Sequence, residues 1–224
     1  AKRGWHADFA DYDNDGLLDV YVTNFTEPYL HECNMLWRNN GDETFSDVSV
    51  ETQSCDTKWG WGAKFVDIDN DGRLDIYAAN GFVSAGKTEY MEVLLDFVFD
   101  DKVDVADARG WPKMGDSSMA GFERNMLLRQ TSSGFVSIGK EAGVDSIGDG
   151  RAVAVADFDN DGRMDIVVTN VNGAPHVYRN TTEPKGNWLE LRLTGAGMKS
   201  NIDAIGARIL VRTADAEQIR EVAS

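Results

Sequence analysis

Residues 11–24 read DYDNDGLLDVYVTN, and the same pattern recurs without gaps as DIDNDGRLDIYAAN at residues 67–80 and DFDNDGRMDIVVTN at residues 157–170. Seven of the fourteen columns are identical in all three blocks. Twelve of the 26 aspartates in the chain lie in these blocks, so much of the net charge of −16 belongs to one repeated local feature. Self-similarity at intervals of tens of residues indicates a repeat architecture.

Short apolar runs on both sides of each block predict β-strands. Each block ends in β-branched and aromatic residues, at 20–22, 76–78 and 166–168, which favour a strand. A Gly-initiated run precedes each block, and a further column follows at 35–39, 126–130 and 176–180. In the first two copies a turn and another strand come next, around Phe45–Val50 and Phe135. One unit is therefore about four short strands, and the sequence predicts an all-β fold of four-stranded antiparallel sheets.

The second unit carries an insertion. The first aspartates of successive blocks are 56 and then 90 residues apart, and the excess falls between Asn80 and Asn125. Within it, five large side chains keep helical spacing: Tyr90, Met91, Leu94, Phe97 and Val98. We expect a helical insertion at about residues 84–122, whose apolar side either docks on the chain's own sheets or, through Tyr90, Leu94 and Phe97, contacts a neighbouring copy.

The spacing of the aspartates predicts calcium binding. Carboxylates at positions 1, 3, 5 and 9 with Gly at position 6 reproduce most of an EF-hand loop, in which position 7 offers a backbone carbonyl. Four carboxylates in one turn repel each other unless a cation offsets the charge. The predicted ligands of three Ca²⁺ sites are Asp11, Asp13, Asp15, Leu17 and Asp19; Asp67, Asp69, Asp71, Arg73 and Asp75; and Asp157, Asp159, Asp161, Arg163 and Asp165.

Two other interpretations of the blocks are weaker. A true EF-hand needs a bidentate Glu at position 12, but that position holds Val22, Ala78 and Val168, and strands rather than helices follow. Asp and Gly also populate ordinary turns. Three copies of the same four carboxylates favour the metal site over the turn.

The calcium sites and the two cysteines both bear on the cellular location of the protein. Sites of four Asp without the bidentate Glu resemble extracellular modules, with dissociation constants on the order of 10⁻⁴–10⁻³ M. Cys33 precedes one predicted strand and Cys55 follows the next, so their hairpin should bring the two ends together. We expect either a Cys33–Cys55 disulfide or two small buried thiols, in a protein that is secreted or exposed at the cell surface, with the periplasm as a further option.

Composition excludes several classes of protein. With 22 basic against 38 acidic residues the chain is too acidic to bind nucleic acid. No apolar run reaches 18 residues, so no membrane-spanning helix is expected.

The blocks, their preceding Gly-x-x-Ala strands and the segment LWRNNGDETF at residues 36–45 resemble FG-GAP/VCBS repeats, which occur in integrin α-subunit propellers and bacterial surface proteins. The segments at 187–193, 200–201, 205–209 and 218–222 resemble the ASPIC/UnbV module. The resemblance implies a β-propeller over residues 1–183 with Ca²⁺ between adjacent strands of a blade, followed by the first part of that module over residues 184–224. It brings no catalytic residue.

Three blocks are too few for a closed ring, since propellers have about four to eight blades. Open blades expose strand edges. We expect these edges to be covered by the remainder of a larger propeller, by a second copy of the chain or by a partner.

Three functions are compatible with the sequence. The first is a calcium-stiffened scaffold for adhesion or for a protein or carbohydrate ligand, with Trp5, His6, Trp61 and Arg151 as a candidate ligand face or as packing between blades. The second is a carbohydrate-active enzyme, a polysaccharide lyase or hydrolase, which the scattered histidines and the absence of Gly-x-Ser-x-Gly disfavour. The third is a subunit of an extracellular oligomer or filament.

Overall fold

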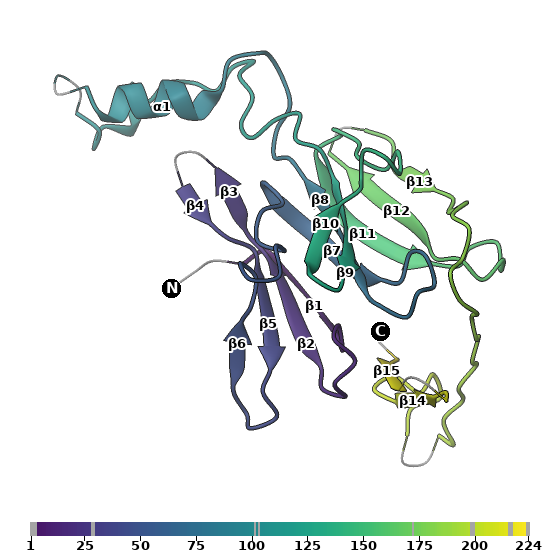
Figure 1. The fold of residues 1–224 in the computed structure, drawn as a ribbon. Helices are drawn as coiled ribbons and strands as arrows, with labels where there is room; N and C mark the ends of the chain where they lie inside the picture. The colour runs from purple at the N-terminus through teal and green to yellow at the C-terminus, as the bar shows by residue number, and fades with distance from the viewer. Residues whose placement is uncertain are drawn as a thin grey trace.

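The computed structural model describes residues 4–27, 30–100, 102, 104–171, 173–197, 200–214 and 217–222. The described chain is nearly all β, with several antiparallel sheets and a single short α-helix (Figure 1). The prediction of partial propeller blades is therefore confirmed.

Each of the three Asp-rich blocks lies within one sheet, and we call these sheets blades 1 to 3. Blade 1 has the strand order β1 (His6–Ala10), β2 (Asp19–Thr23), β5 (Met35–Asn39), β6 (Phe45–Asp47). Blade 2 has the order β7 (Gly60–Val66), β8 (Asp75–Asn80), β9 (Met126–Thr131), β10 (Gly134–Ser137). The described residues of blade 3 form three strands in the order β11 (Gly150–Ala156), β12 (Asp165–Asn170), β13 (His176–Tyr178).

The outer strand of blade 1 is shorter than the sequence predicts. We expected it to run from Phe45 to Val50, but β6 ends at Asp47. Val48 still donates its N–H to the carbonyl of Leu36, and the chain then forms a helical turn closed by a bond from Thr52 to Val48. An alternating sequence does not reveal where this turn begins.

Apolar side chains fill the spaces between neighbouring blades. Leu36 and Ile76 are fully buried between blades 1 and 2, and each such side chain contributes about 1.5–3 kcal/mol to folding. Tyr21 and Tyr77 occupy equivalent, fully buried positions, and their hydroxyls donate to the carbonyls of Ser54 and Val144. Each blade is thus fixed to the turn that follows its own outer strand.

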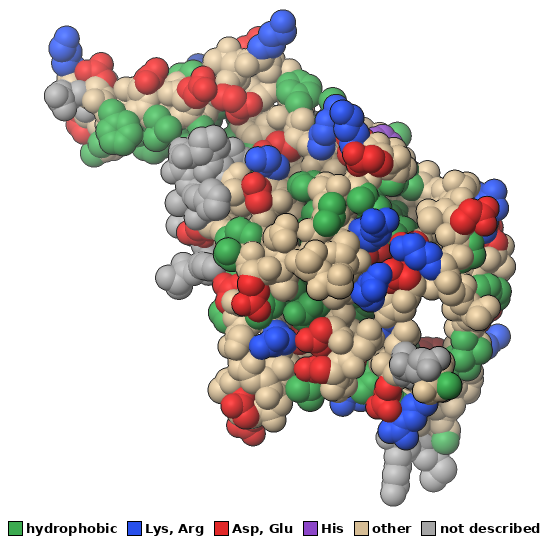
Figure 2. Space-filling view, viewed as in Figure 1, with side chains coloured by type: hydrophobic (Ala, Val, Ile, Leu, Met, Phe, Trp, Pro, Cys, Tyr) green, Lys and Arg blue, Asp and Glu red, His purple; other side chains and the backbone are tan. Residues whose placement is uncertain are grey.

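The insertion contains the predicted helix, α1 (Tyr90–Val98), and a 3₁₀ turn at Ala108–Gly110. Figure 1 shows that α1 projects away from the blades, and no α1 residue is buried. Its apolar side meets the returning segment of the insertion, where Phe97 lies 6.3 Å from Trp111 between ring centroids. Figure 2 shows hydrophobic side chains along one side of this arm and acidic ones along the other.

The remaining elements are two small hairpins. β3 (Phe25–Glu27) pairs with β4 (Leu30–Glu32), and β14 (Arg208–Arg212) pairs with β15 (Glu217–Glu221). Cys33 and Cys55 form a disulfide with their Cα atoms 5.0 Å apart. Closing a loop of 22 residues stabilises the fold by about 3 kcal/mol. Among the described residues, the helices are too short or too polar to cross a bilayer.

Candidate metal centres

Each Asp-rich block forms the turn between the first two strands of its blade. We call these turns loop 1 (residues 11–19), loop 2 (67–75) and loop 3 (157–165). The residue at position 4 of every loop has a left-handed backbone conformation, with φ of 59°, 54° and 56° at Asn14, Asn70 and Asn160. Position 6 is left-handed as well, at Gly16, Gly72 and Gly162. Asn and Gly are the residues that adopt this conformation most readily, which explains why both columns are invariant within the chain.

The first aspartate of each loop closes the turn. In loop 1, the two oxygens of Asp11 accept backbone N–H groups from Asp15 at 3.0 Å and Gly16 at 3.1 Å. Asp67 and Asp157 make the same pair of bonds in loops 2 and 3, with distances between 2.7 and 3.0 Å. The position-5 aspartates each accept the N–H of the residue two positions on, at Leu17, Arg73 and Arg163.

The ninth position has a second role that the sequence does not reveal. Asp19 accepts the N–H of Tyr12 with one oxygen and the N–H of Asn39, at the end of β5, with the other, at 2.9 Å. Asp75 bonds Ile68 and Gln130 in the same way, and Asp165 bonds Phe158 and Asn180. These buried carboxylates therefore tie each loop to the third strand of its blade or, in blade 3, to Asn180 two residues beyond that strand.

The donor set of the three loops suits a hard cation. Carboxylate oxygens lie within 4.8 Å of one another in three groups: Asp11, Asp13 and Asp15; Asp67, Asp69 and Asp71; and Asp157, Asp159 and Asp165. Ca²⁺ takes six to eight oxygen ligands at 2.3–2.6 Å, so such a group supplies part of a shell that backbone carbonyls and water complete. In loop 2, Oδ1 of Asp69 is buried and has no hydrogen-bond partner among the described residues. An unpaired buried carboxylate oxygen is costly unless a cation binds it.

In loops 1 and 2, burial disfavours the ionised form of several aspartates in the absence of a cation. It raises the pKa values of Asp11, Asp13 and Asp67 above their usual range. It raises the pKa values of Asp19 and Asp75 further, to about 7. In loops 1 and 2 the ninth-position aspartates are therefore partly protonated near neutral pH in the absence of a cation.

Basic side chains lie at loops 2 and 3. Lys185 donates its ammonium to Asp69 and lies 3.4 Å from Asp71. Arg179 bonds Asp159 at 2.5 Å and Asp161 at 3.2 Å. Arg73 and Arg163 each pair with the position-5 aspartate of their own loop. These cations occupy the same electrostatic environment that a metal ion would.

The C-terminal segment covers the same end of the blades. Arg208 donates to the carbonyl of Gly16 at 2.9 Å, and Gln218 approaches the carbonyl of Gly72 at 3.4 Å. The indole of Trp188 lies against Gly162. Each of the three loop glycines thus meets at least one side chain from residues 188–219. Between loops 2 and 3 and this segment lies a cavity of 690 Å³.

The four residues proposed as a ligand face come together next to the opposite ends of the inner strands. Trp5 and Trp61 lie 5.0 Å apart between ring centroids, and the Arg151 guanidinium is 4.4 Å from the Trp61 ring. Arg151 donates to the carbonyls of Gly81 and Phe82, and Trp61 donates to Gly81 as well. His6 lies within 3.5 Å of the Ala63 N–H. Trp61 and Arg151 therefore make packing contacts between blades, whereas Trp5 keeps 47% of its surface exposed.

Comparison with known proteins fits this geometry. The model of the FG-GAP-like repeat matches residues 11–78 and 96–168, which contain all three loops. The chain belongs to the FG-GAP-like repeat family. It is also similar to cartilage acidic protein 1 of Xenopus tropicalis, with 24% identity over 206 residues that cover 80% of this chain and 31% of the relative. The FG-GAP-like chain thus spans about a third of the length of that relative.

Some functional residues escaped sequence reasoning. The asparagines at position 4 were invariant in the blocks but had no assigned role, and Lys185 lies outside the repeat. For the asparagines, the available sequence signal was that Asn14, Asn70 and Asn160 occupy the same position in all three blocks. Nothing in the sequence places Lys185 beside loop 2, because the approach depends on the path of the chain after β13.

Proposed function

We propose that this FG-GAP-like chain is an extracellular scaffold in which three Ca²⁺ ions hold adjacent blades in a fixed arrangement. The observation that carries the proposal is the threefold repetition of one loop geometry. In each loop, aspartate oxygens accept the same backbone N–H groups and still leave carboxylates gathered on one side. Ordinary turns need only one such aspartate, so the additional carboxylates favour metal binding.

The residues that would hold the ions are the aspartates at positions 1, 3, 5 and 9, with the position-7 carbonyls of Leu17, Arg73 and Arg163. A bound Ca²⁺ would neutralise the crowded carboxylates and so remove the repulsion that destabilises the folded loops. The protein itself supplies the left-handed turns and the bonds from Asp19, Asp75 and Asp165 to the neighbouring strands.

Three observations support an extracellular location. The sites lack the bidentate Glu of tight cytosolic sensors, so they suit the millimolar calcium outside cells. Cys33 and Cys55 are joined by a disulfide, which persists in oxidising compartments. The similar protein from Xenopus tropicalis is named for cartilage.

Within this scaffold, the exposed Trp5 beside Trp61 is our candidate for contact with a protein or carbohydrate ligand, because an exposed ring backed by a second ring can stack on a sugar face. Adhesion and assembly into an oligomer are the roles that this scaffold would serve. We assign residues 184–224 to an ASPIC/UnbV-like module that packs on the calcium-binding end of the blades.

Calorimetric titration with Ca²⁺ and terbium luminescence test the proposal. We expect three ions per chain, and two in each of the single variants Asp13→Asn, Asp69→Asn and Asp159→Asn. The matched control is Asp203→Asn, an exposed aspartate outside the loops, which should keep three. A stoichiometry that is unchanged in all three loop variants would refute the assignment.

A further inference from the structure

In the described part of the chain, blade 3 has no outer strand equivalent to β6 of blade 1 or β10 of blade 2. In blade 1, β6 pairs with β5, and in blade 2, β10 pairs with β9. The equivalent strand β13 pairs with β12 on one side and with no described strand on the other. After β13 the chain does not turn back, because Lys185 donates its N–H to the carbonyl of Asp69 at 2.8 Å and so follows loop 2.

The outer strands of blades 1 and 2 share a sequence pattern and one backbone contact with the third strand. Each has a phenylalanine followed three positions later by a branched aliphatic residue, Phe45 with Val48 and Phe135 with Ile138. The aliphatic residue donates its N–H to the third strand, from Ile138 to Leu127 at 2.8 Å in blade 2. In blade 2 the phenylalanine also packs against the preceding blade, since Phe135 is 2% exposed and lies 6.3 Å from Tyr12 between ring centroids, whereas Phe45 of blade 1 is exposed.

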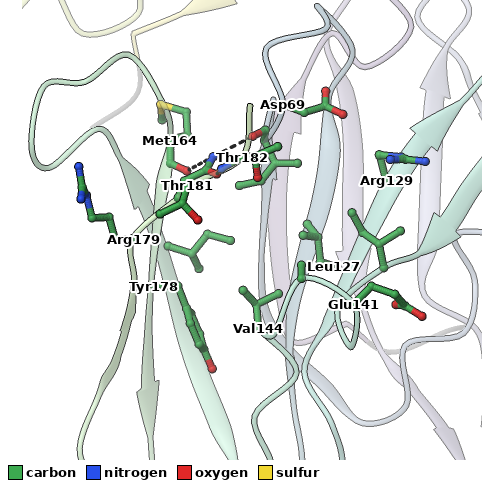
Figure 3. A pocket seen from close by; sticks show the side chains of 15 residues that line it. Asp69, Leu127, Arg129, Glu141, Val144, Met164, Tyr178, Arg179, Thr181 and Thr182 are labelled. Atoms are coloured by element: carbon green, nitrogen blue, oxygen red, sulfur yellow. Dashed lines mark hydrogen bonds between the residues drawn. The ribbon is translucent and has the colours of Figure 1, made fainter. Parts of the chain in front are cut away.

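A pocket lies where blade 3 would need these contacts. Its volume is 310 Å³, and Figure 3 shows it between the side chains of blade 2 and those of β13 and the segment that follows. Its apolar lining includes Ile68, Ile138, Met164 and Tyr178. Ile68 occupies position 2 of loop 2, as Tyr12 does in loop 1. The pocket therefore corresponds to the space that Phe135 fills between blades 1 and 2.

The strand edge beside the pocket is open to pairing. Val177 is opposite Val167, just as Leu127 is opposite Tyr77. The backbone carbonyl of Leu127 accepts a bond from the outer strand, so the same group of Val177 points to the free edge. The Val177 side chain is 67% exposed. An unpaired strand edge next to an apolar pocket is the arrangement in which an extended peptide adds as a further strand.

We propose that the β13 edge and this pocket form a docking site for an extended peptide segment of a partner protein. The segment would carry an aromatic residue for the pocket and, three positions later, a branched aliphatic residue that bonds Val177. The site is continuous with the interface between blades 2 and 3, and the outer strand of blade 2 shows which side chains cover the equivalent site between blades 1 and 2. Arg129 lines the blade 2 side of the pocket in Figure 3, which favours an acidic residue between the two anchors, as Asp47 lies between Phe45 and Val48.

A labelled peptide copied from residues 41–53 of the chain serves as the probe, because it contains Phe45, Asp47 and Val48. In saturating calcium, we expect saturable binding in fluorescence anisotropy. Replacing both anchors of the peptide with alanine should weaken binding by at least about tenfold. Amide exchange of Val177 and Arg179 in the protein should slow when the peptide binds.

Three protein variants test the location. Val177→Pro removes the outward N–H of the edge and should abolish binding, whereas Val177→Ala keeps the N–H and should bind as the unmodified protein does. Ala142→Trp fills the pocket from its exposed rim and should also abolish binding, which covers the case that Val177→Pro fails to fold.

Four results would overturn the proposal. One is no binding up to millimolar peptide, and another is binding that Val177→Pro and Ala142→Trp leave intact. A third is protection of the β13 amides without peptide at every protein concentration, which would show that the chain's own Trp188–Leu191 segment fills the site. The fourth is protection that grows with protein concentration, which would show that a second copy fills it.

Discussion

The side-chain amide of Asn70 donates a hydrogen bond to the backbone carbonyl of Gly162, 2.9 Å away in the next loop. Asn14 makes the same bond to Gly72 at 3.1 Å. The three candidate calcium loops are therefore linked in series by the fourth residue of one loop and the sixth of the next. Because Gly72 and Gly162 also shape the metal sites, an ion in one loop should stiffen its neighbour.

Replacing Asn70 with glycine should weaken this link without straining the turn. Glycine accepts the φ of 54°, so the variant loses the amide but keeps the backbone conformation. We expect a loss of about 1 kcal/mol in the free energy of unfolding, measured by urea denaturation in calcium. Asn40→Gly, which removes an exposed amide that bonds only within its own turn, is the matched control. Equal losses in the two variants would contradict a link between loops.

Gly162→Ala should lower the stability of the fold by much more than the strain of the left-handed backbone alone explains. The left-handed conformation costs about 1–2 kcal/mol for an alanine. At Gly162 the new methyl group would in addition overlap the indole of Trp188, whereas at Gly143 it would meet nothing within 4 Å. Gly143 has a comparable φ of 71°, so Gly143→Ala isolates the backbone cost. We expect a larger fall in melting temperature and a shifted tryptophan emission for Gly162→Ala only, and matching behaviour would place Trp188 elsewhere.

Lys185 should compete with calcium at loop 2. Its ammonium bonds Asp69 and lies near Asp71, and it is about half exposed. Because exposed ion pairs contribute about 0.2–1 kcal/mol, Lys185→Ala should tighten calcium binding at loop 2 by a factor of a few. Terbium luminescence titrations on a background of Asp13→Asn and Asp159→Asn report loop 2 by itself. The exposed Lys140→Ala serves as control, and weaker binding in Lys185→Ala would show that the lysine supports the site.

Stability without calcium should fall as pH rises from about 4 to about 7. Burial raises the pKa values of Asp19 and Asp75 from 3.8 to about 7 in the folded state. Between these values the folded chain binds more protons than the unfolded chain, so rising pH favours unfolding. Melting temperatures in EDTA should therefore be higher at the acid end of this window. In the double variant Asp19→Asn, Asp75→Asn the slope should be flatter, and an unchanged slope would assign it to other groups.

The sequence predicted the repeated parts of the fold and little of what connects them. Each block, beginning at Asp11, Asp67 or Asp157, predicted a strand, a loop and a second strand. This was possible because apolar alternation and the Gly at position 6 determine the conformation of neighbouring residues only. The spacing of Tyr90, Leu94 and Phe97 likewise predicted α1. The sequence predicted an outer strand in the first two copies only, but it did not predict that the chain after Asn180 follows loop 2, because that path depends on tertiary contacts.

The candidate site was predicted as a set of residues but not as a set of contacts. The aspartates at positions 1, 3, 5 and 9 were all named, yet Asp19 and its two counterparts also bridge to a distant strand, which only the packed blade reveals. For the same reason the bond from Asn70 to Gly162 could not be read from a pattern, because 92 residues separate the two. Pairings within one turn follow from spacing, whereas pairings between blades follow from the fold.

Thermal unfolding in EDTA and in a series from micromolar to millimolar calcium, with magnesium in parallel, tests the central claim most directly. Binding to the folded state raises the melting temperature as the ion concentration passes the dissociation constant. We expect the midpoint to climb steeply only at about 10⁻⁴–10⁻³ M calcium and to respond weakly to magnesium, whose smaller octahedral shell fits these loops poorly. A midpoint that is the same in EDTA and in millimolar calcium would show that the aspartate loops do not stabilise this fold through calcium.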